Sequence, residues 1–185
     1  MGSVGRVIAI VAGIVGILSV VLFMVMPDFF AFWSCDVSGF APLDFKLWIG
    51  GFAQRAGEGT MPIPGMETDV TYTEDMILTI ISIVIIAGGA LSIIGGVIQN
   101  RIIGLLGGIA MLLGVVAFIV GLAIQFGDFA DLGDIIEVFG GENLLFGSGS
   151  IPLPPLDADW GLGFGAYFGI GAAAAGIIGG ILIES

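Results

Sequence analysis

Four long runs of uncharged, mostly apolar residues dominate this chain of 185 residues. They cover residues 7–26, 76–98, 102–124 and 160–183, and each is long enough for an α-helix to cross the ~30 Å hydrocarbon core of a bilayer. A backbone in lipid must satisfy its own hydrogen bonds, and a helix does so within one segment. The runs therefore predict a single membrane domain over residues 1–185, an all-α bundle of four transmembrane helices.

The few charged residues lie outside these runs and are strongly biased in sign. The chain has 16 Asp and Glu against 4 Lys and Arg, a formal net charge of −12. Arg6 flanks the first run and Arg101 lies between the second and third, and basic residues near span ends mark the cytoplasmic side. We therefore expect a multi-pass plasma membrane protein whose termini and short turn at 99–101 are cytoplasmic. The long loops 27–75 and 125–159 are then extracytoplasmic, at the cell surface.

The composition argues against most catalytic and cofactor chemistry. The chain contains no histidine and a single cysteine, which excludes histidine-ligated zinc, a Ser-His-Asp triad and iron–sulfur clusters. Four scattered basic residues cannot neutralise a phosphate backbone, which argues against nucleic acid as a partner. Transporters and pumps usually need ionisable groups within the bilayer, and the four runs contain none. We expect a protein of the lipid bilayer that is not an enzyme and has no cofactor.

Small residues recur at four-residue spacing in all four runs. Lipid provides little hydrophobic driving force between helices, and small residues let the backbones approach closely enough for dispersion contacts. We predict that a helix-packing and oligomer interface is formed by Gly161, Gly165, Gly169, Ala173, Gly88, Ser92 and Gly96. A second stripe in the fourth run, at Gly171, Ala175 and Gly179, favours contacts between protomers as well as within the bundle. A helix that is simply central to its own bundle would show the same pattern.

The first long loop has the features of a small β-sheet. Residues 45–49 and 68–73 are rich in β-branched and aromatic residues, and turn-forming Gly and Pro lie between them. They predict strands, and hence a small extracytoplasmic β-containing cap on the bundle. A cluster of aromatic residues at the start of the loop is typical of the lipid headgroup layer. It comprises Phe29, Phe30, Phe32 and Trp33.

The second long loop begins with an amphipathic stretch, which predicts a short helix lying on the membrane surface or on the sheet. Its apolar side comprises Phe129, Leu132, Ile135, Ile136 and Phe139, and its acidic side comprises Asp131, Asp134 and Glu137. A flexible turn is predicted at 147–150, where Gly and Ser alternate. The candidate contact residues of the two loops are Trp33, Trp48, Asp131, Asp134 and Glu137.

The predicted topology places every acidic residue except Glu184 on the outer side. Such a surface either binds cations, including Ca²⁺ held between loops or between protomers, or simply keeps the loops hydrated. Cys35 lies on the same side, where it either cross-links two protomers or is buried, and we expect it to be buried.

This arrangement of spans and loops resembles the claudin and tetraspanin type of architecture. Trp33, followed by Leu47-Trp48, is similar to the tryptophan pattern in the first outer loop of claudins. The resemblance implies a four-helix bundle with both long loops on one side, and it carries over no functional residue. This chain has Gly50-Gly51-Phe52 where claudins carry a cysteine pair, and it has no cysteine-rich second loop of the tetraspanin kind.

Three functions are consistent with these features. The leading hypothesis is a non-enzymatic structural or interaction protein that self-associates laterally through its small-residue helix faces and makes contacts through its acidic loops. The second is a small accessory subunit of a larger membrane complex. The third is an oligomeric channel with a pore between protomers.

Overall fold

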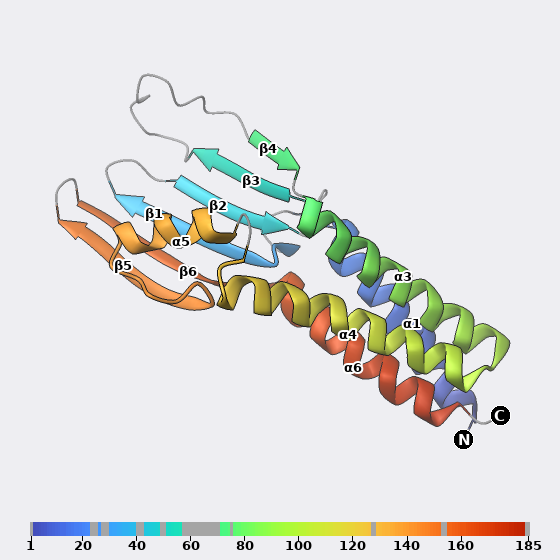
Figure 1. Cartoon of the computed structure of the whole chain (residues 1–185). Coiled ribbons are helices and arrows are strands. Elements are labelled where there is room, and N and C mark those ends of the chain that lie inside the picture. The colour runs from blue at the N-terminus through green and yellow to red at the C-terminus, as the bar shows by residue number, and fades with distance from the viewer. Residues whose placement is uncertain are drawn as a thin grey trace.

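Four long helices form a bundle, and a β-sheet extends from one end of it (Figure 1). The computed structural model describes residues 2–22, 26, 30–39, 43–48, 51–56, 71–74, 76–126, 129–152 and 155–183. Within these residues, four helices are long and apolar enough to cross a membrane. They are α1 (Gly2–Val21), α3 (Met76–Ile98), α4 (Arg101–Ala123) and α6 (Phe164–Leu182). The predicted four-span bundle with a β-containing cap is confirmed.

The helix ends differ from the predicted span ends by more than one residue in α1 and at the start of α6. Helix α1 begins at Gly2 and ends at Val21, so it is shifted toward the N-terminus relative to the predicted span 7–26. Helix α6 begins at Phe164 rather than at Trp160, because residues up to Leu162 pair with other strands in the sheet. The apolar run at 160–183 thus combines the end of a strand with a helix, two elements that hydropathy alone does not separate.

The four helices form a closed ring in which α1 packs against α3, α3 against α4, α4 against α6, and α6 against α1. Glycines bring the backbones together at these contacts. A Cβ added to Gly88 of α3 would lie 2.8 Å from the carbonyl oxygen of Gly107 in α4, and one added to Gly179 of α6 would lie 2.6 Å from the amide nitrogen of Ala9 in α1. Neither position has room for a side chain. The helices can lie this close because glycine has none.

The chain crosses between α3 and α4 in two residues. Gln99 adopts a left-handed backbone conformation with φ of 59°, a conformation typical of helix C-termini. The side chain of Asn100 then accepts hydrogen bonds from the backbone N–H groups of Ile102 and Ile103, at 3.0 and 3.1 Å, and caps α4. This turn and both termini lie at the end of the bundle opposite the sheet (Figure 1).

Both long loops contribute to one antiparallel sheet of six strands, in the order β4-β3-β2-β1-β6-β5. The first loop supplies β1 (Trp33–Gly39), β2 (Leu43–Trp48), β3 (Gly51–Ala56) and β4 (Thr71–Glu74), and the second supplies β5 (Phe146–Pro152) and β6 (Pro155–Leu162). Strands β1 and β6 pair over seven residues, from Trp33 opposite Leu162 to Gly39 opposite Leu156. The two loops therefore form one folded unit, here called the cap together with helix α5.

Two predicted strands are found, and one predicted turn is wrong. Strands β2 and β4 overlap the predicted segments 45–49 and 68–73, of which residues 49 and 68–70 lie outside the described residues. The segment 147–150, predicted as a flexible turn, lies in β5. Its glycines serve packing: a Cβ on Gly147 would collide with the indole of Trp160, and one on Gly149 would collide with the backbone of Phe139.

Helix α5 (Phe129–Val138) confirms the amphipathic prediction and lies over the sheet (Figure 1). Its residues Phe129, Leu132 and Ile136 are buried in the same cluster as the inward side chains of β1 and β6, while Asp134 and Glu137 are exposed. The ring of Phe129 also meets Phe118 of α4 edge-on, with centroids 5.9 Å apart. Of the two predicted locations, the sheet is the one that this helix occupies.

Two members of the aromatic cluster of the first loop, Phe32 and Trp33, do not lie at the membrane interface but inside the protein. Phe32 and Trp33 are only 0% and 1% exposed. Phe32 packs edge-on against Phe118, with centroids 5.4 Å apart, and the indole N–H of Trp33 donates to the carbonyl oxygen of Leu144 at 2.6 Å. The headgroup prediction is therefore wrong for this pair, which joins the cap to the bundle. Phe29 lies outside the described residues.

We expect Trp33→Phe to lower the free energy of unfolding by about 1–3 kcal/mol, because the buried carbonyl of Leu144 then loses its donor. Thermal unfolding of the purified protein in detergent, followed by circular dichroism, measures the change. Trp160→Phe is the matched control, since its bond to the Asn143 carbonyl is only partly buried and its loss should cost less. An equal or larger loss of stability for Trp160→Phe would contradict the importance of the hydrogen bond from Trp33 to Leu144, which joins the two loops.

Candidate functional site

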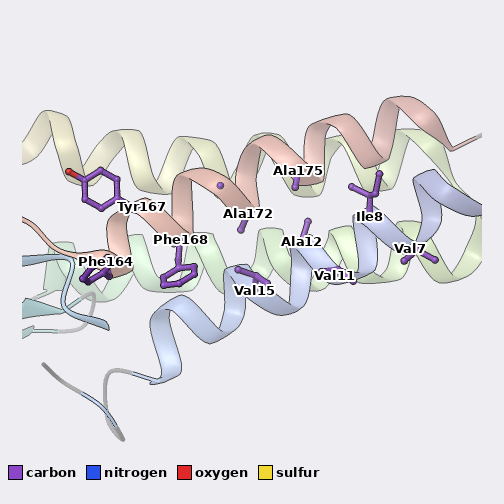
Figure 2. Close-up of a pocket in the computed structure, with 11 residues that line it drawn as sticks. Val7, Ile8, Val11, Ala12, Val15, Phe164, Tyr167, Phe168, Ala172 and Ala175 are labelled. Atoms are coloured by element: carbon purple, nitrogen blue, oxygen red, sulfur yellow. The ribbon is translucent and has the colours of Figure 1, made fainter. Parts of the chain in front are cut away.

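A groove with a volume of about 500 Å³ lies between α1 and α6 (Figure 2). Its surface is almost entirely apolar. The floor is made of small residues, because Ala12 and Ala172 are buried there and nothing lies within 4 Å of a Cβ added to Gly171. The full lining comprises Val7, Ile8, Val11, Ala12, Val15, Phe164, Tyr167, Phe168, Gly171, Ala172 and Ala175.

The groove runs along most of the bundle. Figure 2 shows Phe164, Tyr167 and Phe168 near one end and Val7 at the other. Gly5 lies against Leu182 and Gly16 against Ala172, so the two helices are antiparallel and Val7 is near the level of residue 180. Helix α6 advances about 24 Å between residue 164 and that level, at 1.5 Å per residue. The groove is therefore nearly as long as the hydrocarbon core is thick, about 30 Å.

The first predicted packing stripe of α6 faces the interior of this bundle. Gly165 lies against the backbone of Phe30 and Ala31, Gly169 would place a Cβ 2.9 Å from Val115 of α4, and Ala173 is fully buried. These residues therefore make contacts within one chain. Gly161, the fourth member of the predicted stripe, is not on the helix but in β6, opposite Ser34 and Phe146.

The predicted packing residues of α3 are also used within the chain. Gly88 lies against α4, and Gly96 lies against the Arg6 backbone and Ile10 of α1. The hydroxyl of Ser92 donates to the carbonyl oxygen of Ala9 at 2.9 Å, a buried hydrogen bond between α3 and α1. The contacts seen at these positions are between helices of one bundle.

The second stripe of α6 lies partly inside the bundle and partly on the open groove. Gly179 is buried against α1, Ala175 is half-buried at the edge of the groove, and Gly171 is open. Among the helical glycines of the bundle whose surroundings are described, Gly171 is the one with free space around it. The repeat in the sequence did not distinguish it from Gly165 and Gly169, since the distinction depends on the direction from which α1 and α4 approach.

The candidate contact residues of the loops fall into three groups. Trp33 is buried and cannot contact another molecule. Asp134 and Glu137 are exposed on α5. Trp48 lies on β2 and Asp131 on α5, and their side chains are outside the described part of the structure. Cys35 is fully buried in the cap, as predicted.

The face of the sheet turned away from α5 carries aspartates on β2, β1 and β6, and the register places Lys46 and Arg55 on the same face at β2 and β3. The strand register places Asp44, Asp36 and Asp159 side by side on β2, β1 and β6, and Asp157 lies two residues from Asp159. Asp36, Asp157 and Asp159 are exposed. Where the structure describes the chain, no group of three or more His, Cys, Asp or Glu residues is arranged to hold a metal ion.

No protein-family model matches the chain, and no curated protein matches it. The resemblance to four-span membrane proteins therefore concerns the architecture, which the bundle and its cap show directly.

We expect Gly107→Ala to lower the free energy of unfolding by about 1–3 kcal/mol, since the added methyl group would overpack the contact between α3 and α4. The methyl carbon would lie 2.7 Å from the carbonyl oxygen of Gly88. Gly171→Ala is the matched control in a detergent that keeps the protein monomeric, because nothing in its own bundle lies within 4 Å of the added methyl group, and it should be neutral or stabilising by about 0.5–1 kcal/mol, the usual advantage of Ala over Gly in a helix. Thermal unfolding in detergent compares the two, and equal destabilisation would contradict the placement of these glycines.

Proposed function

We propose that this protein is a non-enzymatic structural protein of the membrane that associates laterally with further copies of itself through the groove between α1 and α6. The observation that supports the proposal is the groove itself, which is apolar, runs along the bundle and has small residues in its lining. In lipid, close approach of helix backbones supplies the dispersion contacts that hold helices together, and the open Gly171 offers that approach to a neighbouring helix.

The length of the groove favours a helix over a lipid chain as its occupant. One leaflet supplies about half of the ~30 Å hydrocarbon core, so a single acyl chain would fill only part of a groove about 24 Å long. A transmembrane helix crosses both leaflets and matches the whole length. The bulky rims formed by Val11 and Val15 on α1 and Tyr167 and Phe168 on α6 would pack against its sides.

A second copy is a suitable source of that helix. A two-fold axis along the membrane normal would bring the exposed face of α6, with Gly171 and Ala174, opposite the same face of the partner. The two long loops of each copy would then project from the same side of the membrane. The caps would be free to contact neighbouring molecules through exposed acidic residues such as Asp134 and Glu137.

The orientation belongs to the same proposal. Arg6 donates a hydrogen bond from Nε to the Gly96 carbonyl oxygen at 3.2 Å, and Arg101 begins α4 beside the turn, so both arginines lie at the end of the bundle away from the cap. Basic residues concentrate on the cytoplasmic side of membrane proteins. We assign that end to the cytoplasm and the cap to the outer surface of the plasma membrane.

Gly171→Leu tests the interface, because it adds a bulky side chain to the lining of the groove at a position where nothing in the same bundle lies within 4 Å of the Cβ. We expect the purified wild-type protein in mild detergent to have a mass that is a multiple of 18.9 kDa, and the variant to have the mass of one chain. Light scattering combined with size-exclusion chromatography measures both.

Ala87→Leu is the matched control, since Ala87 is also exposed on the bundle but lies on α3, away from the groove. It should leave the oligomer intact. A wild-type protein that is monomeric, or an oligomer unchanged by Gly171→Leu, would refute lateral self-association. Stable co-purification with larger polypeptides would instead favour an accessory subunit.

A further inference from the structure

Among the strands that the structure describes, β5 forms one outer edge of the sheet. In the strand order β5 is the last strand after β6, and Figure 1 shows it at the border of the cap. Every second residue of an edge strand turns its N–H and C=O away from its only neighbour. In the described part of the chain, the backbone hydrogen bonds of β5 are those of its ladder with β6. Residues Phe146 to Ser148 are exposed, and no residue of this strand is buried or charged.

Small polar side chains separate this edge from carboxylates. On the face of the sheet turned away from α5, Ser148 lies opposite Asp159 of β6 and Ser150 lies opposite Asp157. Both serines and both aspartates are exposed. A strand added to β5 would lie about 10 Å from β6, two strand spacings away. A long cationic side chain on that strand can pass over a serine and reach the aspartate behind it.

The opposite face of β5 leaves little space for the side chains of an added strand. Gly147 is covered by the indole of Trp160, and Gly149 by the backbone of Phe139 at the end of α5. These contacts fill the space above the strand on that side. A segment added at the edge therefore carries its long side chains on the serine face only, which is an alternation with a period of two residues.

We infer that β5 binds, as a seventh strand, an extended segment of a different protein in which Lys or Arg alternates with small or β-branched residues. Main-chain hydrogen bonds give such strand addition its affinity, and alternate side chains give it specificity. A second copy of this chain does not fit the requirement. Its four basic residues, Arg6, Lys46, Arg55 and Arg101, are too far apart in the sequence to alternate on one strand, and its net charge is −12. The inference rests on the β5 edge and is independent of the groove between α1 and α6.

Two peptides of equal charge test the inference on the full-length protein in non-ionic detergent. The first is a fluorescent peptide of alternating Lys and Thr, and the second alternates Lys and Pro, which disrupts strand pairing but keeps the charge. Fluorescence anisotropy measures both affinities at ~0.15 M salt, a concentration that screens long-range attraction between the peptide and the acidic protein. We expect the Lys-Thr peptide to bind at least about tenfold more tightly, because several main-chain hydrogen bonds are lost with the Lys-Pro peptide. Equal affinities would overturn the inference.

Paired charge variants then locate the binding. Asp157→Asn combined with Asp159→Asn should weaken Lys-Thr binding by about threefold to tenfold, as two partly screened ion pairs are removed. Asp134→Asn combined with Glu137→Gln removes the same charge from α5 and should change the affinity by less than about twofold. An equal loss in both double variants would show that the peptide responds to net charge alone, and this would overturn the placement at β5.

Discussion

The structure depends on direct contact between helix backbones at glycines. Gly13 and Gly89 face each other between α1 and α3, Gly88 and Gly107 between α3 and α4, and Gly108 and Gly176 between α4 and α6. Gly179 lies against Ala9 and completes the ring between α6 and α1. Because lipid is as apolar as the side chains, the helices gain little from burial and much from the dispersion contacts that this proximity allows. Met111, fully buried among Gly16, Gly88 and Gly176, fills the space that remains at the centre.

The cap is built on the end of this bundle, and its position follows from the same close packing. The backbone N–H of Gly163 donates to the carbonyl oxygen of Phe32, and that of Gly165 donates to Ala31, both at 3.0 Å. These bonds join the start of α6 to the segment that leads into β1. They bring the end of the second loop next to the start of the first loop. The tryptophans then hold the second loop in place, since Trp33 and Trp160 donate to the consecutive carbonyls of residues 144 and 143.

The sequence predicts the bundle well because its signals are local. Charge-free runs locate the four spans. Four-residue spacing marks Gly88, which lies against α4, and Gly165, which lies against the segment before β1. The same spacing cannot show that Gly171 is open while Gly169 is packed, because that depends on where the neighbouring helices lie. The strands of the second loop were missed for a related reason. Gly147 and Gly149 have low strand propensity on their own, and they are tolerated in β5 because Trp160 and Phe139 occupy the space beside them.

An engineered disulfide between α1 and α6 tests the central claim, that glycine contacts close the bundle within one chain. A Cβ on Gly16 of α1 would lie 3.6 Å from the Cβ of Ala172 in α6, within the separation of about 3.5–4.5 Å in a disulfide, and its other close neighbour is the flexible side chain of Met111. The double variant Gly16→Cys and Ala172→Cys, with Cys35→Ala, is oxidised in the membrane and analysed on a non-reducing gel and by mass spectrometry. We expect a cross-link within single chains, seen as a monomer two hydrogens lighter than the reduced chain. Cross-linked dimers in place of that monomer, or no cross-link at all, would contradict it.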